Sequence, residues 1–112
     1  LIAIHDKRGC WVLRGEAPSP EELGRRGPDV RTPGRVSVVH TICAGDAAHG
    51  GLLLGLMLHG MGRQRVRQAA RLSQACALTV VESRDSIRGL TAMSVEANLR
   101  RFPTNPPTRV ST

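Results

Sequence analysis

Residues 36–56 read VSVVHTICAGDAAHGGLLLGL, and the sequence pattern changes in the middle of this stretch. Residues 35–39, at its start, are rich in valine and predict a strand. After Gly45, apolar side chains recur at four-residue steps, which predicts a helix buried over much of its circumference. The buried positions expected from this spacing are Ala48, Leu52 and Leu56, with Leu53 and Met57 beside them. Gly60 and Gly62 are expected to end the helix.

The turn between this strand and this helix consists of small residues around one carboxylate, Asp46. The first backbone N–H groups of a helix have no partner within the helix, so they attract anions, phosphate above all. Small residues let an anion approach the backbone, so the segment Cys-Ala-Gly-Asp at 43–46 has the character of an anion pocket. Two roles for Asp46 stay open at this point. It is either an N-cap for the first turn, or a base beside a bound phosphate that takes a proton from an attacking hydroxyl.

The segments before this turn predict a small β-hairpin followed by a loop. Residues 1–4 and 10–14 are short runs of β-forming residues, separated by a polar turn that Gly9 closes. Residues 15–34 hold four prolines and show no apolar periodicity, so they predict a surface loop.

The segments after the turn predict helices. Residues 64–79 predict a second helix with a small-residue face for close packing and with arginines 65, 67 and 71 directed elsewhere. That face consists of Val66, Ala69, Ala70, Ser73 and Ala77. Residues 84–90 form a connection, and Ser94 is expected to cap a short last helix. Because prolines recur from Pro103 onward, residues 103–112 are expected to be a disordered tail after one domain at 1–102.

Composition places the chain among small globular domains and bears on whether nucleic acid is a partner. With 112 residues, it is long enough for one domain and too short for two. Its 16 basic residues exceed its 9 acidic residues by 7, a balance that raises nucleic acid as a partner. No aromatic side chains are interleaved with the arginines to stack on bases, so we expect a solvated helix face and no nucleic-acid partner.

The spacing of the cysteines and the hydropathy of the chain predict its cellular compartment. Cys10, Cys43 and Cys76 are widely spaced and come without a signal peptide, which predicts a reducing, cytoplasmic setting. The apolar run at 50–61 is well short of the roughly 20 residues that cross a bilayer, so no membrane partner is expected. The chain begins with Leu1 inside a predicted strand, which predicts that it is a portion of a longer polypeptide.

The stretch VSVVHTICAGDAAHGGLLLGL resembles the C-terminal signature of the ribokinase-like (PfkB) carbohydrate kinases, usually V-V-D-T-T-G-A-G-D-A-F-x-G-G-L. The segment LIAIHDKRGCWVLRG is similar to the hairpin that precedes this signature. The segment RQAARLSQACALTVVESRDSIRGLTAMSVEANL is similar to the alanine-rich helix and closing segment on its C-terminal side. The resemblance covers residues 1 to about 100 and only the last third of a typical member. It implies an α/β fold, the C-terminal part of a three-layer α/β/α sandwich, in which a short β-hairpin and a strand precede the helices.

The resemblance also implies a reaction: transfer of the γ-phosphate of ATP, with Mg, to a hydroxyl of a sugar or sugar-like substrate. Position by position, Asp46 corresponds to the catalytic base. The backbone of Cys43, Ala44, Gly45 and Asp46 corresponds to the anion hole for the transferred phosphoryl group, and Gly9 and Gly45 to nucleotide-binding positions. This chemistry depends on positioning and charge stabilisation. The predicted function is therefore that of an ATP-dependent kinase with no metal ligand of its own.

Several positions depart from the family pattern. His40 and Ile42 stand where the family has Asp and Thr, so the monovalent-cation site of some members is expected to be absent. Cys43 replaces the first glycine of G-A-G-D, and Ala48 replaces a core phenylalanine, a change that predicts a cavity. Asp6 occupies a glycine position of the hairpin, where its charge is expected to repel nucleotide phosphate.

Three alternatives accompany the kinase interpretation. In the first alternative, the chain is a non-catalytic remnant of the kinase fold that binds a partner protein, or a second copy of itself, through exposed apolar and arginine-rich surfaces. A zinc site at His40, Cys43 and His49, with Asp46 between them, matches no usual zinc spacing. Cys43 is either a reactive thiol at a helix N-terminus or a small buried residue.

Overall fold

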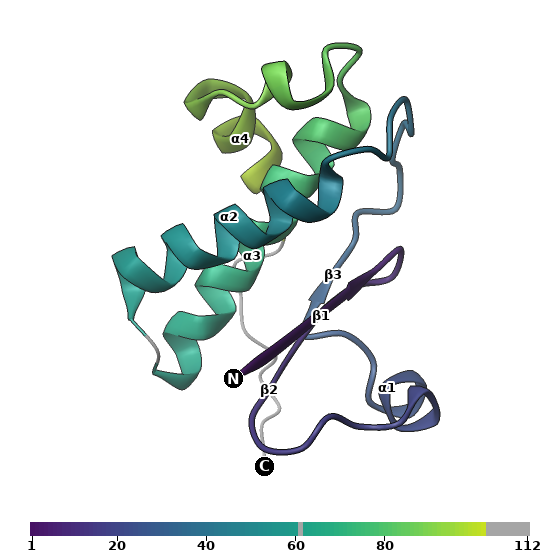
Figure 1. Ribbon diagram of the computed structural model, residues 1–112, viewed down its shortest axis with the longest axis vertical. Coiled ribbons are helices and arrows are strands. Elements are labelled where there is room, and N and C mark those ends of the chain that lie inside the picture. Colours follow the sequence, from purple (N-terminus) through teal and green to yellow (C-terminus); the bar gives the residue numbers. More distant parts are fainter. Residues whose placement is uncertain (61, 103–112) are drawn as a thin grey trace.

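The computed structural model describes residues 1–60 and 62–102, and it has a mixed α/β architecture (Figure 1). A small sheet lies beside two long helices that run side by side. In chain order, the elements are β1 (Ile2–Asp6), β2 (Gly9–Leu13), α1 (Pro20–Arg26), β3 (Val30–Arg31), α2 (Ala44–His59), α3 (Arg63–Glu82), the 3₁₀ helix η1 (Ser86–Gly89) and α4 (Ala92–Leu99). None of these helices combines the length and the hydropathy that crossing a bilayer requires.

The sheet is antiparallel and has the order β1-β2-β3. The predicted hairpin is confirmed, because Ile2 pairs with Leu13 and Asp6 pairs with Gly9. Gly9 has a φ of +147°, and a Cβ atom there would lie 2.0 Å from the carbonyl oxygen of Val30. Only glycine therefore allows β2 to come this close to β3.

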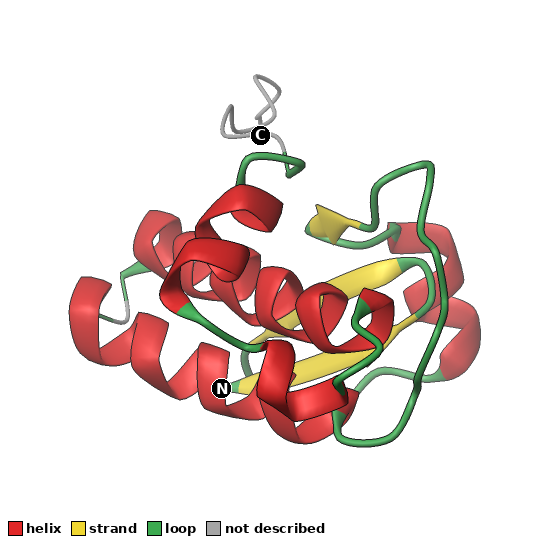
Figure 2. Cartoon of the chain, turned by 90° about the horizontal axis from the view of Figure 1, so that it is seen from above, coloured by secondary structure: helices red, strands yellow, loops and turns green. Residues whose placement is uncertain are grey.

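Side chains of the central strand β2 are buried against helices on both faces of the sheet. Cys10 packs with Ala70, Ala75 and Leu78 of α3. Its neighbour Trp11 is fully buried, and its indole Nε1 donates a hydrogen bond of 3.2 Å to the carbonyl oxygen of Leu23 in α1. Successive strand residues point to opposite faces, so β2 is covered by α3 on one side and by α1 on the other (Figure 2).

The helix pair α2–α3 is held together by small residues. The buried residues of α2 are Ala47, Ala48, Gly51 and Gly55. The prediction that the leucine positions of α2 are the buried ones is therefore largely wrong: Leu52 and Leu56 are half-buried, and Leu53 and Met57 are exposed. The predicted small-residue face of α3 is confirmed at Val66, Ala69, Ala70 and Ser73, which are buried, while Ala77 is half-buried. Two small faces bring the helix backbones close together.

Gly55 lies where the two helices approach most closely, and replacing it with alanine should destabilise the fold. A Cβ atom at Gly55 would lie 2.6 Å from the Cα atom of Ala69, so the helix backbones must shift. We expect Gly55→Ala to lower the free energy of unfolding by about 1–3 kcal/mol. Gly50→Ala is the matched control, because a Cβ atom there meets nothing within 4 Å and helix propensity favours alanine by about 1 kcal/mol. Urea titrations followed by circular dichroism measure both, and equal stability of the two variants would contradict this packing.

Arg71 departs from the prediction that the α3 arginines point away from the core. Its side chain is 7% exposed, and its guanidinium donates hydrogen bonds to the carbonyl oxygens of Leu99 at 3.1 Å and Phe102 at 3.2 Å. Its burial lowers the pKa of the guanidinium. Arg71 therefore joins the middle of α3 to the chain just after α4.

The prediction of a loop at 15–34 is wrong, because this segment contains α1 and β3. Ser19 caps α1 in a reciprocal capping box with Glu22, and Pro20 occupies the first turn. These signals start a helix without the apolar periodicity on which the loop prediction rested.

The predicted strand at 35–39 does not form: these residues have no regular secondary structure. It lies against the end of α3: the N–H of Val39 donates to the carbonyl oxygen of Val81, and that of Ser37 donates to the carboxylate of Glu82. Among the described residues, these N–H groups therefore donate to α3 and not to a neighbouring strand.

The helix boundaries are close to those expected. Helix α2 ends at His59 with Gly60 as its C-cap, as predicted, and α3 extends three residues beyond the predicted end. Helix α4 is capped by Thr91, whereas the prediction assigned the cap to Ser94; Ser94 is the second member of this capping box. The predicted tail at 103–112 lies outside the described residues.

Candidate functional site

The candidate site is centred on the N-terminus of α2, which begins at Ala44 after Cys43. Cys43 adopts the left-handed conformation, with φ 72° and ψ 0°, which costs energy for a residue other than glycine. The cysteine side chain makes no capping hydrogen bond to the described residues. The first N–H groups of α2 thus lack a side-chain cap from this residue.

Asp46 is the third residue of α2, so the prediction that it is the N-cap is wrong. Its side chain is exposed and forms no hydrogen bond or ion pair within the described part of the chain. An acidic residue in the first turn is favourable, because the helix dipole places partial positive charge there. The carboxylate therefore has no side-chain or backbone partner among the described residues.

A cavity of about 630 Å³ opens between the hairpin, the segment after β3 and the start of α2. Ala44, Gly45 and Ala48 form part of its wall. Ala48 is the position where an alanine in place of a phenylalanine was predicted to leave a cavity. Most other lining side chains are apolar, and they are Pro33, Val36, Val38, Ala77, Leu78, Val81 and Phe102. Polar lining residues are His5, Asp6, Lys7, Thr32, Thr41 and Gln74.

The wall of the cavity is held in place by hydrogen bonds between the sheet and both long helices. His5 Nδ1 donates to Gln74 Oε1 at 2.9 Å, which joins β1 to α3. The hydroxyl of Ser73 donates to the carbonyl oxygen of Ala48 at 2.6 Å, which joins α3 to the first half of α2. The cavity therefore has fixed sides contributed by three elements.

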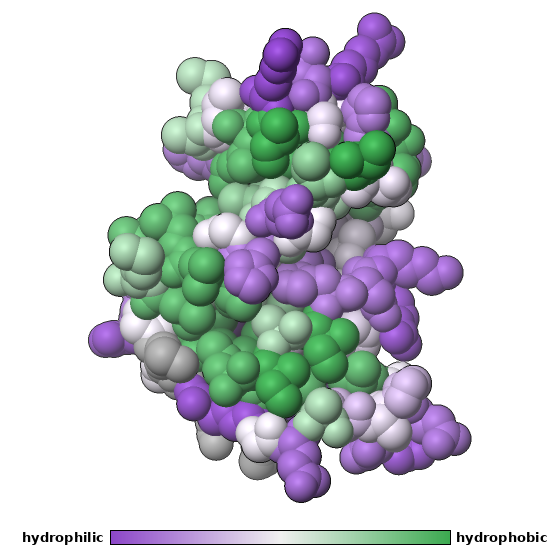
Figure 3. Space-filling model, viewed as in Figure 1, coloured by the Kyte–Doolittle hydropathy of each residue, from purple (hydrophilic) through white to green (hydrophobic). Residues whose placement is uncertain are grey.

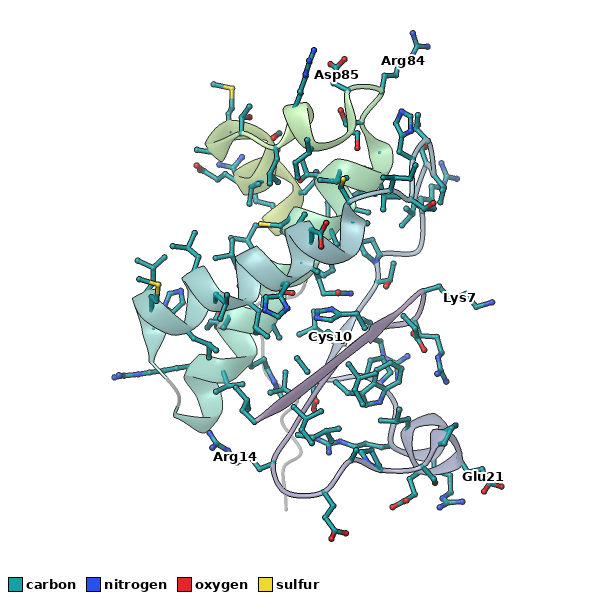
Figure 4. All side chains as sticks on the ribbon, viewed as in Figure 1. Lys7, Cys10, Arg14, Glu21, Arg84 and Asp85 are labelled. Atoms are coloured by element: carbon teal, nitrogen blue, oxygen red, sulfur yellow. The ribbon has the colours of Figure 1, made fainter. Side chains whose placement is uncertain are left out.

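The hairpin tip places charged side chains at the cavity. Lys7 lines it and extends from the tip, as Figure 4 shows. The carboxylate of Asp6 accepts hydrogen bonds from the Arg8 backbone at 2.7 Å and from its guanidinium at 2.6 Å. The hydrogen bond to Arg8 holds the pKa of Asp6 below its usual value. Arg8 thus offsets the charge that was expected to repel phosphate.

Gly9 does not lie at this cavity. It is buried in the sheet, where its missing side chain makes room for Val30. Of the predicted positions, Ala44 and Gly45 line the cavity, whereas Cys43 and Asp46, adjacent to them in sequence, do not.

The cysteines differ in their surroundings. Cys43 is half-buried, whereas Cys10 and Cys76 are buried. Burial, with a smaller effect from the charge of Asp29, raises the pKa of the Cys10 thiol to about 12. Cys10 therefore stays a thiol at neutral pH and serves packing.

The hypothetical zinc ligands are not assembled. Among the described residues, no three His, Cys, Asp or Glu side chains lie close enough together to hold a metal ion. His40 is instead used in a structural contact, in which its Nε2 donates to the carbonyl oxygen of Arg84 at 3.0 Å.

Sequence reasoning missed most of the polar residues around the cavity. Lys7, Thr41 and Gln74 come from three separate segments, and only the folded chain brings them to one place. A signal existed for Gln74, a polar residue within the buried run of α3.

The chain was compared with models of protein families, with curated proteins and with solved structures, and none of the three comparisons found a match.

Proposed function

We propose that the chain contributes the phosphoryl-transfer site of an ATP-dependent kinase that acts on a hydroxyl of a sugar or sugar-like substrate. One observation carries this proposal: the start of α2, without a side-chain cap from Cys43, lies in the wall of a cavity of about 630 Å³. Backbone N–H groups at such a position bind phosphate. The resemblance of residues 36–56 to the ribokinase-like signature supports the same assignment.

The cavity suits a nucleotide in size and in the character of its lining. Binding sites for ligands of this size occupy about 300–1,000 Å³ and combine apolar walls with a few polar groups. Val36, Leu78 and Phe102 offer an apolar surface to a base, while Gly45 offers its backbone N–H group to phosphates; the N–H of Ala44 donates to the carbonyl oxygen of Thr41 at 3.4 Å. Lys7 supplies a positive charge to the same ligand.

Magnesium fits this site as a companion of the nucleotide. Mg²⁺ keeps several water ligands and is commonly held through substrate phosphates, whose charge it neutralises. The carboxylate of Asp6 at the cavity is engaged by Arg8, so the chain presents no cage of acidic side chains there. The donor set of the described residues is consistent with an ion bound mainly by phosphate and water.

In the proposed reaction, Asp46 accepts the proton of the substrate hydroxyl as its oxygen attacks the γ-phosphorus of ATP. The bond from phosphorus to the bridging oxygen breaks, and ADP leaves. The N–H groups of Gly45 and Asp46 stabilise the negative charge on the transferred group, and that of Ala44 joins them by giving up its long hydrogen bond to Thr41. The small side chains at 44–45 leave room for the phosphates in the cavity, whereas Asp46 does not line it, and its role as base requires the substrate hydroxyl to bind outside the cavity, beside the first turn of α2.

The proposal predicts that Mg-ATP raises the thermal stability of the chain, because a ligand that binds the native state stabilises it. At a ligand concentration 100 times the dissociation constant, the gain is about 2.7 kcal/mol. Gly45→Asp should abolish this gain, because it adds a carboxylate where phosphate is proposed to bind. A Cβ atom at Gly45 meets nothing within 4 Å, so the variant should fold. Thermal melts with and without Mg-ATP provide the measurement.

Gly62→Asp is the matched control, because Gly62 is the N-cap of the other long helix and does not line the cavity. We expect this variant to retain the stabilisation by Mg-ATP. The proposal is contradicted if the unmodified chain gains no stability, or if Gly45→Asp gains as much as the control.

A non-catalytic role in binding a partner is the second candidate function. It is favoured by large exposed apolar side chains, among them Ile42, Met57 and Met93, which are 74%, 83% and 82% exposed. This candidate predicts no effect of Mg-ATP on stability, so the same melts separate the two functions.

A further inference from the structure

The outer face of α2 is an apolar surface that no described residue covers. Leu53, Leu54, Met57 and Leu58 are between 48% and 83% exposed, although α2 belongs to the packed helix pair. Figure 3 shows apolar surface gathered over this part of the molecule. A helix that is apolar all round is normally buried on every side. The surface formed by these four residues with Gly50, here called the outer stripe, therefore fits a partner.

The charges at the two ends of α2 favour a second copy of this chain as the partner. Asp46 is the only acidic or basic side chain other than histidine between Ala44 and His59, and it lies at the start of the outer stripe, four residues before Gly50. Docking on the outer stripe therefore involves no other charged side chain of α2. At the other end of α2, the guanidinium of Arg65 lies beside Gly60: its Nη1 is 3.8 Å from the position of a Cβ atom there. The helix thus carries a negative group at its start and a positive group at its end. Two copies packed antiparallel bring each Asp46 toward the Arg65 of the other, and their helix dipoles also oppose.

The shape of the outer stripe is complementary to itself in the same arrangement. Helical periodicity puts Gly50, Leu53 and Met57 on one line along α2, on the side opposite to the buried glycines. If Leu53 of one copy meets Leu54 of the other, the antiparallel register places Met57 opposite Gly50. Met57 is the most exposed of these side chains, and the space above Gly50 is open. A large side chain therefore meets a gap at both ends of the contact.

We propose that the outer stripe of α2 is the interface of a symmetric homodimer in which the two α2 helices pack antiparallel. The interface is isologous: the same residues face each other across a two-fold axis near Leu53. Met57 of each copy fills the space above Gly50 of the other. This inference does not rest on the proposed kinase function, but both use Asp46: the dimer brings its carboxylate toward Arg65 of the other copy, whereas the kinase needs it free for a substrate hydroxyl.

The test is a double-mutant cycle on the oligomeric state, measured by sedimentation equilibrium. The unmodified chain should dimerise, and Met57→Ala and Gly50→Leu should each raise the dissociation constant by about tenfold or more. The double variant Gly50→Leu, Met57→Ala should recover most of this loss, because the leucine occupies the space left by the methionine of the other copy. Circular dichroism verifies folding, and the open space at Gly50 predicts that Gly50→Leu folds.

Met93→Ala is the control, since Met93 is equally exposed but lies on α4. It should leave the dissociation constant unchanged. The proposal is overturned if the unmodified chain is monomeric at about 100 µM, where contacts of even modest affinity are populated. It is also overturned if Met93→Ala weakens the dimer as much as Met57→Ala does, or if the double variant shows no recovery. A monomer that binds phosphatidylglycerol vesicles through Met57 would assign the stripe to a membrane surface instead.

Discussion

Under the proposed kinase function, replacing Asp46 with asparagine should lower the turnover of phosphoryl transfer by a factor of about 10²–10⁴, the usual contribution of a positioned general base. Asparagine keeps the size of the side chain and removes its ability to accept the substrate proton. Asp46 makes no hydrogen bond or ion pair with other described residues, so the fold should be unaffected. Stabilisation by Mg-ATP should remain, because the backbone N–H groups are unchanged. The measurement is ADP release in the natural gene product with a panel of sugars.

Asp85→Asn is the matched control for this experiment. Asp85 is also exposed, and Figure 4 shows it at the end of the molecule near Arg84, in the connection after α3. We expect full turnover in this variant. If Asp46→Asn also turned over at the unmodified rate, Asp46 would be a first-turn helix acid and not a base, even with ATP bound.

Trp11→Ala should cause the largest loss of stability, about 3–5 kcal/mol, because a fully buried large side chain is lost. The indole also donates a hydrogen bond to the carbonyl oxygen of Leu23 and lies under the guanidinium of Arg8, 4.8 Å from its ring centre. The free energy of unfolding of a typical domain is only about 5–15 kcal/mol, so this loss threatens folding at physiological temperature. Urea titrations should be followed by circular dichroism, because Trp11 is the only tryptophan and its fluorescence disappears in the variant.

Trp11→Phe separates packing from polar contacts at the same position. Phenylalanine retains most of the apolar volume and lacks the N–H group, so we expect a loss of about 1–2 kcal/mol. If Trp11→Ala cost no more than Trp11→Phe, burial of Trp11 against α1 would not be what stabilises this part of the fold.

The elements that sequence predicted well are those with strong local signals. The hairpin follows from two short β-forming runs around Gly9, and the end of α2 follows from Gly60. The small-residue face of α3 was recognisable because alanine and serine recur at helical spacing. Which face of α2 is buried was predicted incorrectly, because the periodicity of leucine is uninformative in a helix that is apolar on every side. The buried face is the one that carries the glycines at 51 and 55, because these glycines allow close contact with α3. Contact with another helix cannot be read from the periodicity of α2 alone.

Elements that depend on a distant partner were not predictable. Residues 35–39 have the composition of a strand, yet they lie against the end of α3, because Val81 and Glu82 supply their hydrogen-bond acceptors. Arg71 was assigned to the surface from its charge. It is buried because the carbonyl oxygens of Leu99 and Phe102 accept its hydrogen bonds. In both cases the partner is many residues away.

For the candidate site, the sequence identified the turn at 43–46 but not the cavity beside it. The small residues and Asp46 are contiguous, so a local pattern reveals them. The cavity requires the hairpin tip, the segment after β3 and α3 to meet, and no local pattern encodes that meeting. The position of Cys43 before the helix was predicted, but its left-handed conformation was hidden, because that conformation is one that glycine usually adopts.

The two halves of this structure should also form on different timescales. Helices α2 and α3 are neighbours in sequence, and contacts between such neighbours form quickly, within about microseconds to milliseconds. The sheet joins them through contacts such as that between His5 and Gln74, 69 residues apart, whose loop-closure entropy makes docking the slower step. Because the cavity takes its walls from both halves, it comes into existence only with that last step. Ligand binding during refolding would therefore report the completion of folding, and a chain arrested with its helix pair formed would be unable to bind.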